Sequence, residues 1–252
     1  MNRLRFFHFA FLAISALVQS QSVPASKEAD SVYPAAFDLY VDLHQHPELS
    51  AHETRTAATL AEHLRGLGYD VTEHVGGTGV VALLKNGPGP TIMLRTELDA
   101  LPVEEKTGLP YASKTHTKDD AGHDVPVMHA CGHDLHMAAL YGTASIMVHS
   151  KNTWHGTLML IGQPAEEAIG GARAMIADGF ATRFPKPDFG VALHVINELP
   201  AGTVGIIPGT YNSNADSLRI TIYGKGGHTR RSTPSSSPPA PSWLCRPSPL
   251  VK

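Results

Sequence analysis

A cysteine and a histidine two positions apart mark the densest cluster of reactive side chains in this sequence, Cys131-Gly132-His133-Asp134. Thiolate and imidazole groups are strong ligands for borderline-soft metal ions, and a carboxylate completes the mixed shell that is typical of zinc. A lone cysteine is more often an inert buried thiol, but the histidine and the aspartate beside Cys131 favour metal ligation. This tetrapeptide therefore predicts one part of a metal site.

Two more groups of candidate ligands stand where apolar runs end. Glu166 and Glu167 follow a run that closes with Gln163-Pro164-Ala165, and His194 follows another. One of two adjacent glutamates can bind a metal while the other takes a proton from water that the metal has made more acidic. Taken singly, the pair would be interpreted as a solvated acidic turn and His194 as a core histidine. In combination they predict a two-metal hydrolase centre, whose candidate ligands are Cys131, His133, Glu167 and His194.

Carboxylates and histidines near these ligands are candidates for supporting roles. A carboxylate behind a metal-bound histidine fixes its tautomer and its ring orientation. Asp99 is the candidate for that position, although an aspartate that caps a turn would look the same. The further supporting candidates are Glu97, His129, Asp134 and His136. The histidines expected to be structural or superficial are His44, His46 and His52.

Alternating helical and extended patterns predict an α/β fold from about residue 35. Ser50-Ala51-His52-Glu53 predicts a capping box that opens an amphipathic helix through Leu64. Other predicted helices span 37–44, 133–148 and 170–177, and predicted strands span 69–75, 79–84, 91–96, 157–161 and 189–193. The last two strands are continuously apolar, so we expect them to be buried in a sheet that helices cover on both faces.

The candidate site residues follow predicted strands. Asp99, the Glu166–Glu167 pair and His194 each come shortly after one. Sites in open α/β sheets gather outside the carboxyl ends of the strands, because loops converge there on a rigid sheet. We therefore expect these residues to meet at one edge of the sheet.

Composition argues against several classes of protein. A formal net charge of −3 gives no electrostatic reason to expect binding to nucleic acid or to an anionic membrane. The 252 residues allow one large domain or two modest ones. Cys131 and Cys245 are the only cysteines, so the chain is not a disulfide scaffold. A bridge between the two is the less favoured alternative to metal ligation by Cys131.

The N-terminus has the pattern of a secretory signal peptide over residues 1–22. Arg3 and Arg5 precede an apolar run over 6–18, a polar stretch follows, and no acidic residue occurs before Glu28. The apolar run is too short for a comfortable membrane span. We therefore expect secretion, with no membrane association after cleavage, and a mitochondrial presequence is the alternative.

From about residue 33 to residue 228 the chain resembles the amidohydrolase branch of the M-twenty metallopeptidase family. That branch includes hippurate hydrolase, N-acyl-amino-acid hydrolases and the plant auxin-conjugate amidohydrolases. The segments that carry the resemblance are Leu43-His44-Gln45-His46-Pro47-Glu48-Leu49-Ser50, Val75-Gly76-Gly77-Thr78-Gly79-Val80-Val81, Asp99-Ala100-Leu101-Pro102, Thr107-Gly108-Leu109-Pro110-Tyr111-Ala112-Ser113, His129-Ala130-Cys131-Gly132-His133-Asp134, Gln163-Pro164-Ala165-Glu166-Glu167, His194-Val195 and Gly224-Lys225-Gly226-Gly227-His228.

This resemblance implies a zinc-exopeptidase-like catalytic domain over 33–213, with a central mixed sheet flanked by helices. Family members insert a small α/β lid domain into it and commonly form homodimers through that lid, whose first strand would be 214–228. The implied cofactors are two divalent metal ions, zinc or manganese, with cobalt or nickel as alternatives. The implied metal ligands are Cys131, His133, Glu167 and His194.

The resemblance also implies roles in a reaction. Glu166 would be the general base, Asp99 the carboxylate that supports the centre, and His228 a lid residue that stabilises the oxyanion. The substrate would be a small N-acyl amino acid. Water would attack its amide carbonyl, and Glu166 would pass a proton to the leaving amine.

Two departures from the family pattern are expected to matter. Glu97 stands where the family usually has aspartate, and residues 229–252 are about half Pro and Ser, a composition foreign to the family. We interpret this segment as a disordered tail from a shifted or mis-spliced reading frame, which would leave the catalytic domain truncated. One alternative function is therefore an inactive remnant that binds metal or substrate and whose dimerisation is in doubt. A zinc dipeptidase or carboxypeptidase is the other.

Overall fold

The structure, a computed structural model, describes residues 21–22 and 27–209. Three predictions lie wholly or mostly outside those residues. They are the signal peptide over 1–22, the lid strand over 214–228 with His228, and the tail over 229–252 with Cys245. The described helices and strands belong to one compact unit that ends at Gly205.

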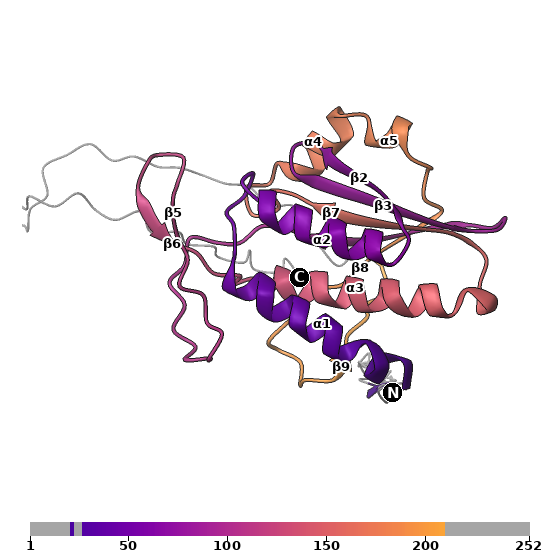
Figure 1. Cartoon of the computed structure of the whole chain (residues 1–252), viewed down its shortest axis with the longest axis horizontal. Helices are drawn as coiled ribbons and strands as arrows, with labels where there is room; N and C mark the ends of the chain where they lie inside the picture. Colours follow the sequence, from indigo (N-terminus) through magenta and orange to yellow (C-terminus); the bar gives the residue numbers. More distant parts are fainter. Residues whose placement is uncertain (1–20, 23–26, 210–252) are drawn as a thin grey trace, which may run out of the picture. The chain divides into compact units, whose positions relative to one another are not determined.

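A five-stranded mixed sheet forms the centre of this unit (Figure 1), with the strand order β2-β3-β7-β4-β8. The strands span Asp70–Val75 (β2), Gly79–Asn86 (β3), Thr91–Glu97 (β4), Gly156–Gln163 (β7) and Phe189–Ala192 (β8). Strand β4 runs parallel to both β7 and β8, whereas β3 pairs antiparallel with β2 and β7. The predicted central mixed sheet flanked by helices is confirmed.

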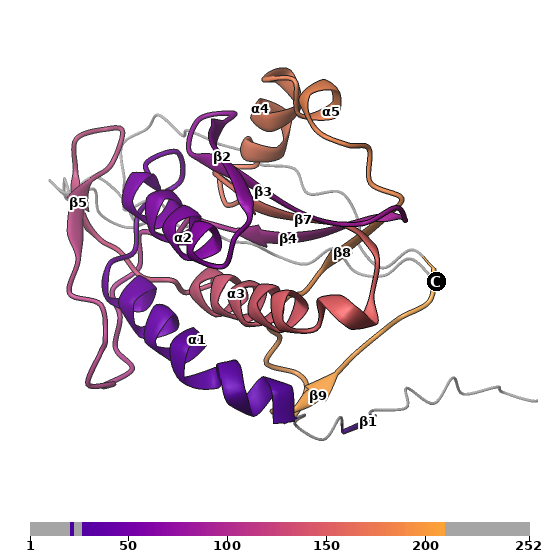
Figure 2. The ribbon, with the colours of Figure 1, turned by 45° about the vertical axis from the view of Figure 1, so that its right-hand side comes forward.

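Helices α2 and α3 pack on one face of the sheet, and α1 packs against α3 (Figure 2). These helices span Lys27–Gln45 (α1), Thr54–Gly66 (α2) and His133–His149 (α3). Helical spacing places Ala57, Leu60, Ala61 and Leu64 of α2 on one buried stripe. The stripe joins the main core with the side chains of β3 and β7 that point to this face, which are Val80, Ala82, Leu84, Leu158 and Leu160.

The opposite face carries a smaller core under α4 (Gly171–Ala177) and α5 (Phe180–Arg183). Successive side chains of a strand point to opposite faces, so Val81, Met159 and Ile161 lie on this side of the sheet. They pack with Met175 of α4 and Val75 of β2. Both faces of β3 and β7 are therefore covered, which explains why these two strands are almost fully buried.

The remaining elements are short. Strands β5 (His116–Lys118) and β6 (Asp124–Pro126) form a hairpin that projects from the body, at the left of Figure 1. Strands β1 (Gln21–Ser22) and β9 (Thr203–Val204) pair antiparallel, and Lys151–Thr153 is a 3₁₀ turn, η1. Among the described helices, none combines the length and the apolar character that a membrane span requires.

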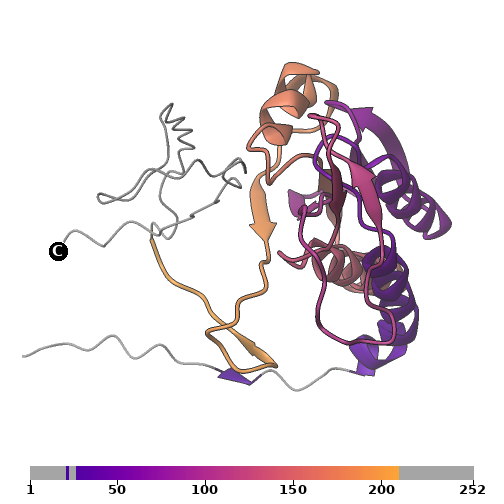
Figure 3. The same ribbon diagram turned by 90° about the vertical axis from the view of Figure 1, so that its left-hand side faces the viewer.

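Strand β8 is exposed along its whole length, so the prediction that it is buried is wrong. Phe189 and Val191 are 63% and 53% exposed. Within the described part of the chain β8 pairs only with β4, and it lies at the open margin of the sheet, the upper and larger of the two orange arrows in Figure 3. The equally apolar β7 is buried because β3 and β4 flank it. An apolar run shows that a strand suits a buried position and cannot show what lies beside it.

The predicted capping box is also wrong. Helix α2 begins at Thr54, and its first free amides, those of Arg55 and Thr56, donate to the carboxylate of Glu48. The Ser50 hydroxyl instead donates to Asp99. The fully buried Glu53 side chain keeps one local partner, the Ala51 N–H, and otherwise accepts from Thr78 and Ala165. The reciprocal hydrogen bonds between Ser50 and Glu53 that a capping box requires are therefore replaced by other partners.

Candidate metal centre

The candidate residues meet at the carboxyl edge of the three parallel strands. Asp99 lies two residues beyond β4, Glu166 three beyond β7 and His194 two beyond β8. Since these strands are adjacent and parallel, the three loops that follow their carboxyl ends lie side by side, as predicted from the sequence. The start of α3 brings the Cys131–His133 segment to the same edge.

His133 is the residue that the candidate ligands share. Its side chain is fully buried, and its Nδ1–H donates to the backbone carbonyl of Asp99 at 2.7 Å. Its Nε2 lies 3.8 Å from a carboxylate oxygen of Glu166 and 4.0 Å from one of Glu167. A histidine whose Nδ1 is held by an oxygen presents Nε2 outward, which is the arrangement of metal-binding histidines.

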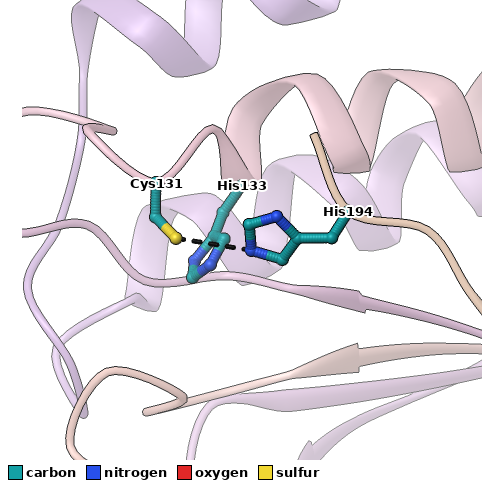
Figure 4. A group of neighbouring side chains, drawn as sticks. All are labelled: Cys131, His133 and His194. Carbon is teal, nitrogen blue, oxygen red and sulfur yellow. Dashed lines mark hydrogen bonds between the residues drawn. The ribbon is translucent and has the colours of Figure 1, made fainter. Parts of the chain in front are cut away.

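Cys131 and His194 complete this group on the other side of His133. The Cys131 Sγ lies 3.4 Å from the His194 Nε2 (Figure 4). The His194 Nδ1–H donates to the carbonyl of Val195 at 2.7 Å, which leaves Nε2 directed at the thiol. Ligand atoms of Cys131, His133 and His194 all lie within 4.8 Å of one another, and the same holds for His133, Glu166 and Glu167.

Asp99 contacts two of the candidate ligands at once. Its carboxylate lies 3.3 Å from the His133 Nδ1, and its second oxygen accepts the backbone N–H of Glu167 at 2.9 Å and the Ser50 hydroxyl at 2.6 Å. Burial opposes ionisation of Asp99, but hydrogen bonds with His133, Ser50 and the Glu167 amide outweigh it and hold its pKa below the usual value. This is the position that the predicted supporting carboxylate would need.

The loop that carries Glu166 and Glu167 is tightly folded. Ala165 has a positive φ of 44°, a conformation that costs a residue with a Cβ roughly 1–2 kcal/mol. The loop returns so closely on itself that a Cβ on Gly171 would lie 1.5 Å from the carbonyl oxygen of Pro164. The Ala165 amide donates to the buried Glu53 carboxyl at 2.7 Å. The backbone therefore holds the two glutamates in place before any ligand binds.

His136 and Glu97 form a neighbouring group with its own hydrogen bonds. The His136 Nδ1–H donates to Glu97 at 2.9 Å, and its Nε2 accepts the Val195 N–H at 2.9 Å. Burial alone would raise the pKa of Glu97, but His136 and Arg95 outweigh it and lower the pKa. Glu97, His133 and His136 are close enough to hold an ion, yet both nitrogens of His136 are already occupied. The pair therefore holds the Val195 backbone and with it the loop of His194.

The other histidines singled out in the sequence have different surroundings. His44 is buried between Asp134, at 2.7 Å, and Glu105, at 3.1 Å, and the hydrogen bond with Asp134 raises its pKa although burial opposes the rise. Asp134 thus faces His44, not a candidate ligand. His129 is buried without a hydrogen-bond partner in the part of the chain that the structure describes, and burial lowers its pKa to about 4. His46 and His52 are on the surface.

The most informative residue that the sequence interpretation missed is Glu53. Its side chain joins the 164–167 loop to two other loops, and the capping-box pattern concealed it because that pattern assigned Glu53 a local partner. A glutamate among the polar residues at the start of a predicted helix carries no signal of a long-range contact. His228, a predicted catalytic residue, lies outside the described residues.

Unsatisfied polar atoms show that the site fits a cation. His133 Nε2 and Glu167 Oε1 are buried, have no hydrogen-bond partner among the described residues and lie 4.0 Å apart. Buried polar atoms are nearly always paired, so an unpaired donor set of this kind indicates a ligand. Burial alone would lower the pKa of His133, but its interactions with Asp99 and Cys131 raise it to about 11, so the surroundings of this ring favour a positive charge. Sulfur, nitrogen and oxygen donors together suit zinc-like divalent ions.

Known proteins resemble the chain in sequence and in fold. N-acetyl-L-cysteine deacetylase of Bacillus subtilis (strain 168) is 41% identical over 74% of this chain and 42% of its own length. Thermostable carboxypeptidase 1 of Saccharolobus solfataricus is 40% identical over 74% of this chain and 45% of its own. A Bacillus subtilis crystal structure described as a dinuclear metal binding peptidase from the M20 family superposes with a TM-score of 0.59 at 33% identity, over 68% of this chain and 45% of that one.

The chain spans about half the length of the curated relatives it matches. The family model described as Peptidase family M20/M25/M40 matches residues 93–251, which is more than half of the chain and includes every candidate ligand. The predicted resemblance is confirmed, and this chain belongs to the peptidase family M20/M25/M40.

Proposed function

We propose that this chain is the metal-binding part of a metal-dependent amidohydrolase that cleaves the amide bond of small N-acyl amino acids. The observation that carries the proposal is the pair of buried, unpartnered atoms, His133 Nε2 and Glu167 Oε1, beside the thiol of Cys131 and the imidazole of His194. A deacetylase of N-acetyl-L-cysteine at 41% identity supports the substrate class.

Cys131, His133, Glu167 and His194 would hold two divalent ions, zinc or manganese, with cobalt or nickel as alternatives. Such ions, when bound, polarise the amide carbonyl and make water more acidic. Burial raises the pKa of the Glu167 carboxyl, so without a cation this group is poorly suited to carry its charge. His133, locked by Asp99, can turn only its Nε2 to the site.

Glu166 has the position of a general base. Its side chain is 39% exposed, whereas those of His133 and Asp99 are fully buried, so its carboxylate can reach both the ligand cluster and an arriving substrate. In the proposed reaction Glu166 takes a proton from water as the water oxygen bonds to the acyl carbon. It then gives that proton to the amine nitrogen as the C–N bond breaks.

Two further proposals rest on the resemblance alone, because they involve residues outside those described. We propose that His228 stabilises the oxyanion and that the assembled enzyme is a homodimer. We also propose, from the N-terminal sequence pattern, that the chain is secreted.

Hydrolysis of N-acetyl amino acids and hippurate by the purified chain, with added zinc, manganese or cobalt, tests the proposal. We expect turnover that falls by about 10²- to 10⁴-fold in Glu166→Gln, with the bound metal unchanged when measured by elemental analysis. Turnover that persists in Glu166→Gln would refute the role of this residue. Stoichiometric metal binding without turnover would favour the inactive remnant.

Peptide cleavage is the second candidate, because a thermostable carboxypeptidase is 40% identical to the chain. The two activities share the cluster and differ in the group that flanks the scissile amide. Comparison of kcat/KM for an N-acetyl amino acid and for an N-acetyl dipeptide with the same C-terminal residue separates them. A higher kcat/KM for the dipeptide would contradict the amidohydrolase proposal and favour a peptidase.

A further inference from the structure

Glu53 is a fully buried carboxyl group that pairs with no cationic side chain in the described part of the chain. Its Oε1 accepts the backbone N–H of Ala51 at 2.9 Å and of Ala165 at 2.7 Å, and its Oε2 accepts the hydroxyl of Thr78 at 2.6 Å. Burial of a carboxyl group is costly unless hydrogen bonds satisfy it. These three donors come from three separate loops, so Glu53 links the turn before α2, the β2–β3 turn and the loop after β7.

One of the two amides that Glu53 holds belongs to a residue with strained backbone in the loop after β7. Ala165 keeps a φ of 44° and directly precedes Glu166. Strained backbone persists where surrounding contacts impose it, and it concentrates at functional sites. On the other side of Glu166, the Glu167 amide donates to Asp99 at 2.9 Å. Two buried carboxyl groups thus hold the backbone on both sides of Glu166.

We infer that Glu53 is a positioning residue for the Glu166–Glu167 pair. By fixing the Ala165 amide it keeps both carboxylates directed at His133, the general base on one side and the metal ligand on the other. This inference rests on the proposed function for its catalytic meaning, whereas the geometry that it explains is independent of turnover.

The role requires hydrogen-bond acceptors and no negative charge. In Glu53→Gln the amide oxygen can accept from both Ala51 and Ala165, and the NH₂ group can donate to the Thr78 hydroxyl. Glu53→Leu fills a similar volume without an acceptor and leaves both amides unpaired. Glu48 provides a matched control, because its carboxylate also binds two backbone amides, those of Arg55 and Thr56, away from the 164–167 loop.

The experiment compares the full chain with Glu53→Gln, Glu53→Leu and Glu48→Leu. Hydrogen exchange of peptides that cover 163–168 reports the loop without any metal, and titration with Co²⁺ reports ligand placement through the absorption spectrum of the bound ion. In Glu53→Leu we expect faster exchange in this loop and Co²⁺ affinity lower by about 10- to 100-fold, the usual effect of removing an outer-shell partner. Glu53→Gln should match the wild type in both measurements.

Glu48→Leu should lower thermal stability yet leave the exchange of the 163–168 loop and the Co²⁺ spectrum unchanged. Equal effects of Glu53→Leu and Glu48→Leu would overturn the inference, since they would show a general loss of stability. So would a folded Glu53→Leu with wild-type exchange and affinity. If Glu53→Leu does not fold, Glu53→Asp, which withdraws the acceptor by one methylene group, takes its place, and wild-type behaviour of that variant would contradict the role.

The outcomes separate this inference from the proposed function. Wild-type chain that binds Co²⁺ without turnover refutes the amidohydrolase activity and leaves the Glu53 comparison intact. Wild-type chain that binds no Co²⁺ leaves the decision to hydrogen exchange alone. If turnover is present, Glu53→Leu should lower kcat more than it raises KM, because the base is displaced and the substrate contacts remain.

Discussion

The loop after β7 and the loop after β8 both bring candidate ligands to the site, but they are held very differently. Two buried carboxyl groups, Asp99 and Glu53, bind the backbone on either side of Glu166. His194 is exposed, and the polar contacts of its loop with the rest of the site are the Cys131 thiol and one hydrogen bond from Val195 to His136. The half of the site on the loop after β7, with Glu166 and Glu167, is therefore fixed by buried groups of the core. The half on the loop after β8, with His194, follows an edge strand that is itself exposed.

This difference predicts that the candidate ligands contribute unequally to metal affinity. A ligand that is already fixed loses little conformational freedom when an ion binds, so its contribution to affinity is largely retained. A ligand on an exposed loop must be ordered first, which offsets part of its contribution. We therefore expect the buried ligands to determine whether an ion binds and His194 to refine how tightly it is held.

Removal of His133 should have the largest effect. His133→Ala takes away the residue common to both ligand groups, and we expect Co²⁺ or Zn²⁺ affinity to fall by more than the roughly 10- to 100-fold typical of an outer-shell change. His194→Ala should weaken binding less. Calorimetric titration of both variants, with the exposed His46→Ala as control, measures the contrast. An equal loss in the two variants would show that the two halves contribute alike.

Among these variants, His44→Ala should cause the largest loss of folding stability. His44→Ala leaves Asp134 and Glu105 without their shared partner, and breaking a buried ion pair in this way typically costs about 3–5 kcal/mol. The pKa of His44 is raised in the folded state, so its contribution is fully present below the unfolded pKa of about 6.5 and is lost as pH rises through the folded value. Urea denaturation across pH 6 to 9 should show this decline in the wild type and not in the variant.

Replacement of the supporting carboxylate should have a smaller effect on affinity. Asp99→Asn keeps the shape of the side chain, but its amide group can place an NH₂ against the Glu167 amide or against His133. We expect metal affinity to fall by about 10- to 100-fold with little change in the unfolding midpoint. Competition with a chromophoric chelator measures it, and unchanged affinity would place the support of His133 in the Asp99 backbone carbonyl alone.

Local pattern was enough to predict the five strands of the central sheet, the helices over 133–148 and 170–177, and the convergence of the site loops. Each depends on a period or on a strand end that a short window contains. Glu53, the edge position of β8 and the partner of Asp134 could not be predicted in this way. Each depends on residues brought together from distant parts of the chain, such as Ala165 with Glu53 or His44 with Asp134. The motif residues were recognised by type, whereas the groups that hold them were visible only in the folded structure.

The smallest predicted effect lies at the contact between the two halves. Gly132 has a φ of 82°, and a Cβ added to it would lie 2.6 Å from a methyl group of Val195. Gly132→Ala should therefore lose about 1–2 kcal/mol of stability through backbone strain and push the exposed loop of His194 outward. Because the loop after β7 is held independently, the thiolate absorption of bound Co²⁺ should change more than the affinity does.

A second substitution separates the two causes of that loss. Val195→Ala removes the methyl group, so Gly132→Ala with Val195→Ala should recover the steric part and the Co²⁺ spectrum while the strain of the positive φ remains. Thermal unfolding and the Co²⁺ spectra of the wild type, the two single variants and the double variant separate the steric contribution from the backbone strain. Gly132→Ala is expected to disturb the Cys131–His194 contact and to leave hydrogen exchange in the 163–168 loop unchanged. An equal disturbance of both would show that the loops after β7 and β8 are mechanically coupled, and not independent.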